Sequence, residues 1–179
     1  MPAVDPLGSR RPPGDGLRFF FHCTECDDYD HRVMSTERRH LDHLPPCWVE
    51  PESCYFITVC AEPRGVNHLC RPSLAPVFWE SISYRHRQGV WFCHLAVFMP
   101  DHVHFLLSFS DISSFSLIIG DWKRWLTLRC AISWQENFFD HRLRREESFK
   151  QKAEYILHNP VRAGLVQEAK DWPYVWIPK

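Results

Sequence analysis

The chain has 179 residues, of which 45% are hydrophobic and 15% aromatic, enough apolar side chains for the core of one domain. Its formal net charge of −1 points to no particular partner. No segment approaches the roughly 18 consecutive apolar residues of a membrane helix, and the first residues lack the apolar run of a secretion signal. We therefore expect a cytoplasmic protein with no membrane association and with reduced cysteines.

Residues 1–46 differ in composition from the rest. Residues 1–52 carry six Arg and ten Asp or Glu, a balance of −4, and half of the fourteen prolines. Such a segment has little apolar surface to bury. We expect 1–46 to form a partly disordered N-terminal arm and 47–179 to form the folded domain.

A C-x-x-C pair, Cys23 and Cys26, lies within this arm. It supplies half of a zinc site. His40 and His43 follow, three residues apart and within a plausible spacing, but they form no clean second half in this acidic, proline-flanked arm. Zinc binding by the arm therefore stays open at this stage.

Strands and helices are expected to alternate from Ser53 onward, as judged by apolar periodicity and by turn residues. The first is a strand at 54–60, followed by a helix at 75–87 that is closed by Gly89. A hairpin of strands at 90–98 and 102–109 comes next, and then a helix from about 113 to 133. A short strand and loop lie within 134–145, and a last helix at 146–158 stops at Asn159-Pro160. This order favours an antiparallel sheet with helices on one side. The fold class is α+β, a two-layer sandwich.

His102 and His104 are the first candidates for chemistry. Side chains two residues apart on a strand project from the same face, so both imidazoles would lie close together. Val103, Phe105 and their successors would hold the opposite face against the core. The pair suits two ligands of one divalent metal ion, although two exposed histidines without a function give the same pattern.

Tyr155 and Asn159 are the second candidates. They lie four residues apart on the last helix and so share a face, beside its apolar stripe. Asn159 offers an amide oxygen as a third metal ligand. The alternative is structural: Tyr155 at the margin of the core and Asn159 as the polar stop before Pro160.

Joined, these residues suit attack on a phosphodiester. A metal ion held by His102, His104 and Asn159 can stabilise charge on phosphate oxygens. The Tyr155 phenolate can attack phosphorus and form a phosphotyrosine. Lys152, one turn before Tyr155, is best placed to lower its pKa, although Lys150 and Arg162 are also near in sequence.

A third candidate is the basic and aromatic run 121–125, which contains Trp122, Lys123 and Arg124. Alternating rings and cations suit single-stranded nucleic acid, because rings stack on bases and cations follow phosphates. Within 122–145 six basic residues stand against two acidic ones. The alternative is that the tryptophans belong to the core and the cations to a solvated surface.

Four segments resemble the REP-associated tyrosine transposases, relatives of the single-tyrosine HUH transposases. They occur in the order and spacing of that family, over about residues 47–174. The segments are FMPDHVHFLL at 98–107, WQENFFDHRLR at 134–144, YILHNPVRAGLV at 155–166 and WPY at 172–174.

The resemblance implies a ferredoxin-like fold, in which 47–179 form the catalytic domain. It implies Mg²⁺ or Mn²⁺ held by His102, His104 and Asn159, with Tyr155 as the nucleophile. The implied reaction cleaves and rejoins single-stranded DNA at hairpins, without a small-molecule cofactor, in a monomer or homodimer. The expected DNA contacts are Trp122, Lys123, Arg124, Asp140, His141, Arg142, Arg144, Arg145, Lys152 and Arg162.

One residue departs from the family pattern. Asp101 stands where that family has Asn before the first histidine. We expect this change to affect a turn rather than the chemistry.

Two rival functions remain open from the sequence. The first is a protein that binds DNA hairpins without cutting them, which would need neither Tyr155 nor the metal. The second is a metal-dependent phosphoesterase that uses water as the nucleophile. It would need the histidines but not Tyr155.

Overall fold

A computed structural model describes residues 53–111, 114–143 and 146–178. The N-terminal arm with its C-x-x-C pair, and the expected DNA contacts Arg144 and Arg145, lie outside these residues. In chain order the described elements are β1 (Cys54–Glu62), α2 (Ala75–Arg87), β2 (Phe92–Phe98), β3 (His102–Ser108), α3 (Phe115–Cys130), β4 (Ser133–Trp134), β5 (Phe139–Arg142), α4 (Glu146–Leu157), α5 (Asn159–Arg162), the 3₁₀ turn η2 (Ala169–Asp171) and β6 (Val175–Trp176).

One antiparallel sheet forms the centre of the molecule. Its strand order is β4-β1-β3-β2-β6, and β5 also pairs with β1, beside β4. Strands β1 and β3 pair in register from Cys54 opposite Ser108 to Cys60 opposite His102. The β5-β1-β3-β2 order with α2 and α3 as crossovers is the ferredoxin-like arrangement that the sequence predicted.

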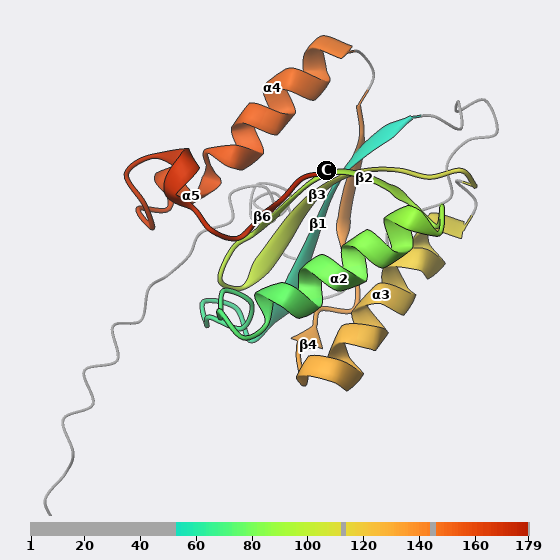
Figure 1. Cartoon of the computed structure of the whole chain (residues 1–179), viewed down its shortest axis with the longest axis horizontal. Coiled ribbons are helices and arrows are strands. Elements are labelled where there is room, and N and C mark those ends of the chain that lie inside the picture. Colours follow the sequence, from blue (N-terminus) through green and yellow to red (C-terminus); the bar gives the residue numbers. More distant parts are fainter. Residues whose placement is uncertain (1–52, 112–113, 144–145, 179) are drawn as a thin grey trace, which may run out of the picture.

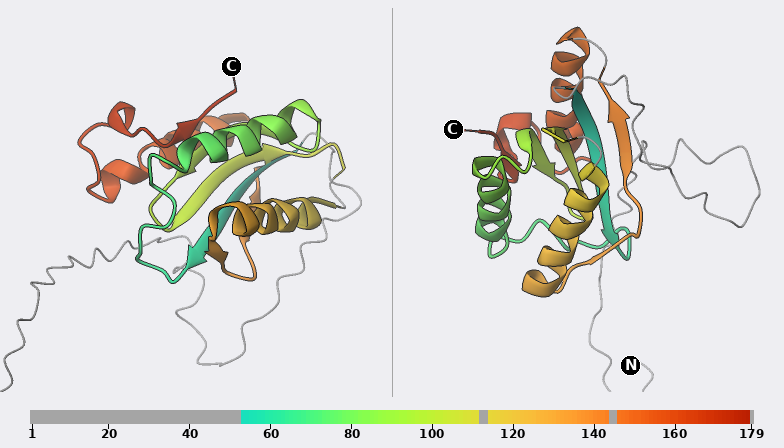
Figure 2. Two further views of the ribbon diagram at one scale, coloured as in Figure 1. Left: turned by 60° about the horizontal axis from the view of Figure 1, so that its bottom comes forward. Right: turned by 90° about the vertical axis from the view of Figure 1, so that its right-hand side faces the viewer.

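Helices α2 and α3 cover one face of the sheet. Phe78 and Ile82 of α2 and Ile119 of α3 are buried against Ile57, Phe105 and their neighbours on that face. The helix predicted at 75–87 is therefore confirmed. Figure 1 shows α2 and α3 side by side, with the strands between them and α4, and Figure 2 gives two further views.

The other face of the sheet carries α4. Ile156 is fully buried there in a second core cluster with Phe56, Val97 and Leu106. The expectation of helices on one side is thus incomplete: it describes α2 and α3, and α4 adds a helix to the opposite face. Because side chains alternate along a strand, this second face also carries His102 and His104.

The helix ends agree with local sequence signals. Gly89 has φ +68°, a left-handed conformation that favours glycine, and it directly follows the last residues of α2. Helix α4 ends at Leu157, and α5 restarts at Asn159 with Pro160 in its first turn. This break sets Asn159 at the start of a new helix.

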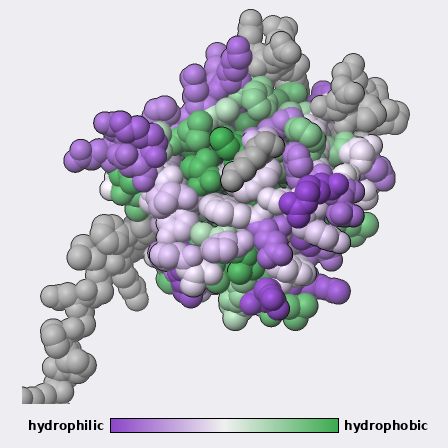
Figure 3. All heavy atoms as spheres, in the orientation of Figure 1, coloured by the Kyte–Doolittle hydropathy of each residue, from purple (hydrophilic) through white to green (hydrophobic). Residues whose placement is uncertain are grey.

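The surface is mixed in character. In the space-filling view, hydrophobic residues lie beside α4, and hydrophilic residues cover the outer parts of α4 and α5 (Figure 3). Among the described helices, none has both the length and the apolar character needed to cross a membrane.

Candidate functional site

The two histidines lie side by side on β3, and both are buried. His102 is 3% exposed and His104 is 2% exposed. Their Nε2 atoms are 3.1 Å apart. The prediction that both imidazoles share one face of the strand is confirmed, whereas the alternative of two exposed histidines is wrong.

Each imidazole has a partner at its other nitrogen. His102 Nδ1 lies 2.6 Å from Asp101 Oδ1. His104 Nδ1 lies 2.9 Å from Thr58 Oγ1, on the neighbouring strand β1. These contacts orient both rings so that the Nε2 atoms converge, which is how metal-binding histidines are usually supported.

Burial and nearby cations disfavour a proton on His104. Desolvation is the largest cause, followed by the positive charges of His102, Lys152 and Arg162, and together they hold its pKa well below the ordinary value. A neutral imidazole is the form that binds a metal ion. His104 is therefore held in the neutral form, which has a ring nitrogen with a free lone pair.

Helix α4 brings Tyr155 over the same face. Tyr155 packs against the cluster that contains Phe56 and Ile156, and it is half-buried. The Lys152 ammonium lies 4.3 Å from the centre of the Phe56 ring and 4.9 Å from that of Tyr155. Phe56 in turn stacks on His104, with ring centres 5.4 Å apart. A short series of contacts thus connects the tyrosine with the histidine pair.

Arg162 joins Tyr155 to Asn159. Its guanidinium lies 3.8 Å from the centre of the Tyr155 ring. It donates one hydrogen bond to the Tyr155 carbonyl oxygen, at 2.6 Å, and another to Asn159 Oδ1. The amide oxygen expected to bind metal is therefore bonded to Arg162 in this structure.

The donor set fits a divalent ion. Among residues 53–111, 114–143 and 146–178, no group of three or more His, Cys, Asp or Glu side chains could hold a metal. Within the described part of the chain, the candidate for a third ligand is the neutral amide oxygen of Asn159, as the sequence predicted. Two imidazoles with supported outer nitrogens are a suitable core for such a site.

Trp122 is fully buried between the sheet and the α2 and α3 helices. Its indole N–H donates to Ser81 Oγ at 3.1 Å. The prediction that Trp122 contacts DNA is wrong, because no base can reach its ring. The alternative, a core tryptophan on the inner face of its helix, is confirmed.

Lys123 and Arg124 lie on α3, on the side of the sheet away from the histidines. Lys123 is half-buried and donates to the carbonyl oxygens of Gln135 and Glu136 at 2.7 and 2.8 Å. Arg124 is exposed. Both line a shallow groove of about 440 Å³ that also includes Thr127 and Gln135.

The expected contacts on β5 divide between the two sheet faces. His141 is exposed opposite Phe56 on the face of the histidine pair. Asp140 and Arg142 lie opposite Ile57 and Tyr55 on the other face. Of the expected DNA contacts that are described, Lys152, Arg162 and His141 are therefore the ones on the face of Tyr155.

Three supporting residues were not assigned to the site by the sequence. Asp101 lies in the turn between β2 and β3, and it also contacts His102 directly, which the sequence did not predict. Arg64 and Thr58 lie far from the histidines in the chain. Only the contact between Asp101 and His102 could have been expected from the sequence, because these two residues are adjacent. The contacts of Arg64 and Thr58 depend on loop packing and on strand register.

Comparisons with known proteins agree with the resemblance seen in the sequence. No protein-family model matches the chain. Over 81 residues, 44% of this chain, it is 30% identical to the REP-associated tyrosine transposase of Escherichia coli K12, and the match spans 49% of that relative, about half its length. Over 139 residues it is 29% identical to a putative REP-associated tyrosine transposase of Haemophilus influenzae Rd, covering 67% of this chain and 77% of that one.

A solved structure supports the same relationship. It is that of a REP-associated tyrosine transposase bound to a REP hairpin, with a TM-score of 0.62, 25% identity, and coverage of 79% of this chain and 82% of the other. By its α+β fold and these matches, the chain is similar to the class of tyrosine transposases. Within that class, the matches in sequence and in structure are to REP-associated tyrosine transposases.

Proposed function

We propose that this protein cleaves and rejoins single-stranded DNA at hairpins through a covalent 5′-phosphotyrosine. The observation that carries the proposal is that Tyr155 lies over the same sheet face as the His102–His104 pair. Lys152 contacts the rings of Tyr155 and Phe56, and Phe56 stacks on His104. The hairpin bound in the related structure supports the choice of DNA partner.

His102, His104 and Asn159 would hold Mg²⁺ or Mn²⁺. When bound, the ion supplies Lewis-acid stabilisation of charge on the scissile phosphate. Arg162 donates a hydrogen bond to Asn159 Oδ1, and this amide oxygen keeps a second lone pair that could bind the ion. A DNA phosphate is a strong alternative partner for the guanidinium. We therefore assign Arg162 to the DNA path.

Tyr155 is the proposed nucleophile. Its phenolic oxygen forms a bond to phosphorus as the bond from phosphorus to the 3′ oxygen breaks. The phenol loses its proton and the leaving oxygen gains one, which gives a free 3′-hydroxyl. Lys152 and Arg162 each hold a positive charge beside the Tyr155 ring, at 4.9 and 3.8 Å from its centre. The phosphotyrosine keeps the energy of the broken bond, so a 3′-hydroxyl can reverse the step and join strands.

The test is an adduct assay with a labelled single-stranded oligonucleotide that carries an imperfect-palindrome hairpin and single-stranded flanks. The protein is incubated with Mn²⁺ or EDTA and run on a denaturing protein gel. We expect a shifted band with Mn²⁺ only, absent from Tyr155→Phe and from His102→Ala. Tyr84→Phe is the matched control, since Tyr84 is 56% exposed on α2, outside the site.

The rival functions predict other patterns. Cleavage without an adduct, retained in Tyr155→Phe, would indicate a phosphoesterase that uses water. Hairpin binding without cleavage or adduct, unchanged by EDTA, would indicate a protein that only binds hairpins. Retention of the adduct in Tyr155→Phe would assign the nucleophile to another residue.

A further inference from the structure

Asp101 is a charged residue with no exposed side-chain surface. Burying a carboxylate costs several kcal/mol unless other groups compensate its charge and hydrogen bonds. Here both oxygens have partners: Oδ1 lies 2.6 Å from His102 Nδ1, and Oδ2 accepts from the Gly65 N–H at 2.7 Å and pairs with Arg64 Nε at 3.1 Å.

The backbone around Asp101 holds the carboxylate in place. The Ala61 N–H donates to the Asp101 carbonyl oxygen at 2.7 Å. The N–H groups of His68 and Leu69 donate to the Pro100 carbonyl oxygen at 2.8 and 3.0 Å. The turn between β2 and β3 is thus bonded to the loop after β1, and this loop supplies both Arg64 and Gly65. The orientation of the carboxylate toward His102 follows from these contacts.

A carboxylate accepts hydrogen bonds and cannot donate them. The close contact to Asp101 therefore requires the proton of neutral His102 on Nδ1, which leaves the Nε2 lone pair facing His104. We propose that Asp101 is a positioning residue that holds His102 in the Nδ1–H form and so keeps Nε2 for a divalent ion, with Arg64 and Gly65 orienting the carboxylate. This inference rests on the metal site of the proposed function.

The second histidine lacks such a constraint. Its partner, the Thr58 hydroxyl, can either donate or accept. Since His102 Nε2 has no proton, the 3.1 Å contact between the two Nε2 atoms requires His104 to donate from Nε2 in the metal-free protein. Thr58 then donates to His104 Nδ1. To hold an ion through Nε2, His104 would need its proton on Nδ1, with the Thr58 hydroxyl as the acceptor.

Asparagine at position 101 would not hold His102 in the Nδ1–H form. The Gly65 N–H and Arg64 Nε–H are donors that meet the same oxygen, so an amide would turn its own oxygen toward them. Its NH₂ group would then face His102 Nδ1 and donate to it. The proton of His102 would move to Nε2, the atom that must bind metal.

Two measurements on the whole chain test this inference. Long-range ¹H–¹⁵N spectra of the imidazoles in metal-free protein at neutral pH identify the protonated nitrogen of each histidine, and titration calorimetry gives the Mn²⁺ affinity. We expect wild-type His102 to carry its proton on Nδ1. In Asp101→Asn we expect it on Nε2, with Mn²⁺ affinity about 10- to 100-fold lower. The control is Asp121→Asn, which also removes a carboxylate paired with an arginine, Arg85 at 3.0 Å, outside the site.

Several results would overturn the inference. One is a spectrum of the wild-type protein that places the proton of His102 on Nε2. This spectrum tests the inference even if Asp101→Asn does not fold. Another is a folded Asp101→Asn with the wild-type proton position or the wild-type Mn²⁺ affinity. The wild-type protein could instead have the expected proton positions and bind neither Mn²⁺ nor Mg²⁺. This result would contradict the metal site of the proposed function, but it would agree with the role of Asp101 in setting the tautomer of His102.

Discussion

At the scale of single residues, Arg162 contacts two of the proposed catalytic groups, Tyr155 and Asn159. Its guanidinium stacks on the Tyr155 ring and bonds the side chain of Asn159. A planar guanidinium can make both contacts at once, which a lysine ammonium cannot. We therefore expect the position of the proposed nucleophile, Tyr155, to depend on this side chain.

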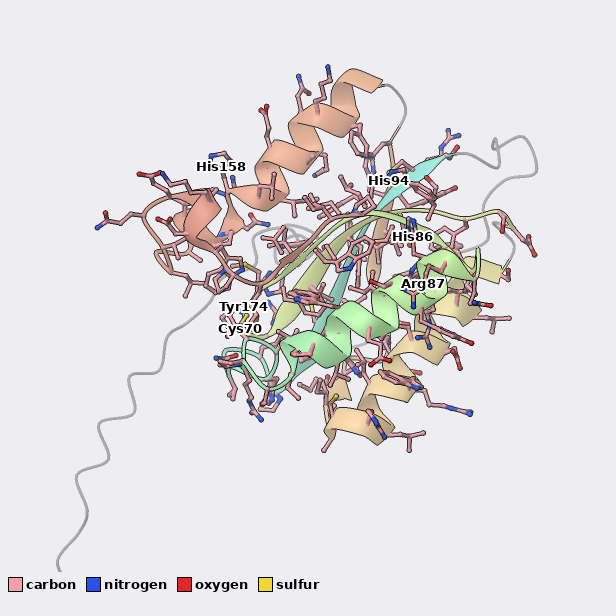
Figure 4. All side chains as sticks on the ribbon, in the orientation of Figure 1. Cys70, His86, Arg87, His94, His158 and Tyr174 are labelled. Atoms are coloured by element: carbon pink, nitrogen blue, oxygen red, sulfur yellow. The ribbon has the colours of Figure 1, made fainter. Side chains whose placement is uncertain are left out.

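We expect Arg162→Gln to slow adduct formation by about 10- to 100-fold, since small displacements of a nucleophile have large effects on rate. Arg162→Lys should restore little of the rate. The measurement is the rate of adduct formation at saturating DNA, which separates positioning from affinity. Arg87→Gln is the control, because Arg87 is exposed at the end of α2 (Figure 4). Equal effects of the two substitutions would argue against a positioning role for Arg162.

His94 makes folding sensitive to pH. Burial, followed by the charge of His86 nearby, lowers its pKa below the ordinary value (Figure 4). Its Nε2 lies 2.9 Å from Ser108 Oγ, and its ring packs against Phe92 and Phe149. The unfolded chain binds a proton on His94 near pH 6.5, whereas the folded chain resists it.

Stability should therefore fall as the pH drops below about 6.5, the ordinary histidine pKa. We expect His94→Gln to lose less stability than wild type between pH 7.5 and 5.5. Urea unfolding at both pH values measures the difference. Because other histidines also titrate in this range, the contrast between the two proteins isolates His94. An identical pH dependence would contradict this account.

At the scale of elements, two glycines differ in how well their positions would accept a side chain. Gly89 adopts φ +68° after α2, a conformation that side chains with a Cβ rarely adopt. Gly120 lies inside α3, where an added Cβ would meet no atom within 4 Å.

We expect Gly89→Ala to lower the free energy of unfolding by about 1 kcal/mol or more, since the left-handed region disfavours alanine. Gly120→Ala should raise it by up to about 1 kcal/mol, because alanine favours the helix. Urea unfolding of both variants compares the same chemical change at two positions. A destabilised Gly120→Ala would show that α3 depends on close approach at that position.

At the scale of the whole molecule, the proposed site links β1, β3, α4 and α5. A ligand that binds only the folded chain stabilises it, by about 2.7 kcal/mol at a concentration 100 times its Kd. Saturating Mn²⁺ should therefore raise the thermal midpoint by several degrees in wild type. His102→Ala should show no such shift. A shift of equal size in this variant would place the bound ion elsewhere.

Local spacing determined much of what the sequence predicted. The spacing of His102 and His104 set both rings on one face, because alternation along a strand is a local property. The same holds for the apolar stripe of α2, for its end at Gly89, and for the break of the last helix before Pro160. The motifs that indicated the family are likewise continuous stretches of the chain.

Tertiary structure decided what depends on distant partners. Trp122 and Arg124 are neighbours in one helix, but only packing against Ser81 and the sheet made the first a core residue and left the second exposed. Likewise, α4 lies over the histidine pair because Ile156 is buried against Phe56 and Leu106. Such contacts join residues far apart in sequence, so local periodicity cannot encode them. For the same reason, the ion pair between Asp101 and Arg64 emerged only from the folded chain.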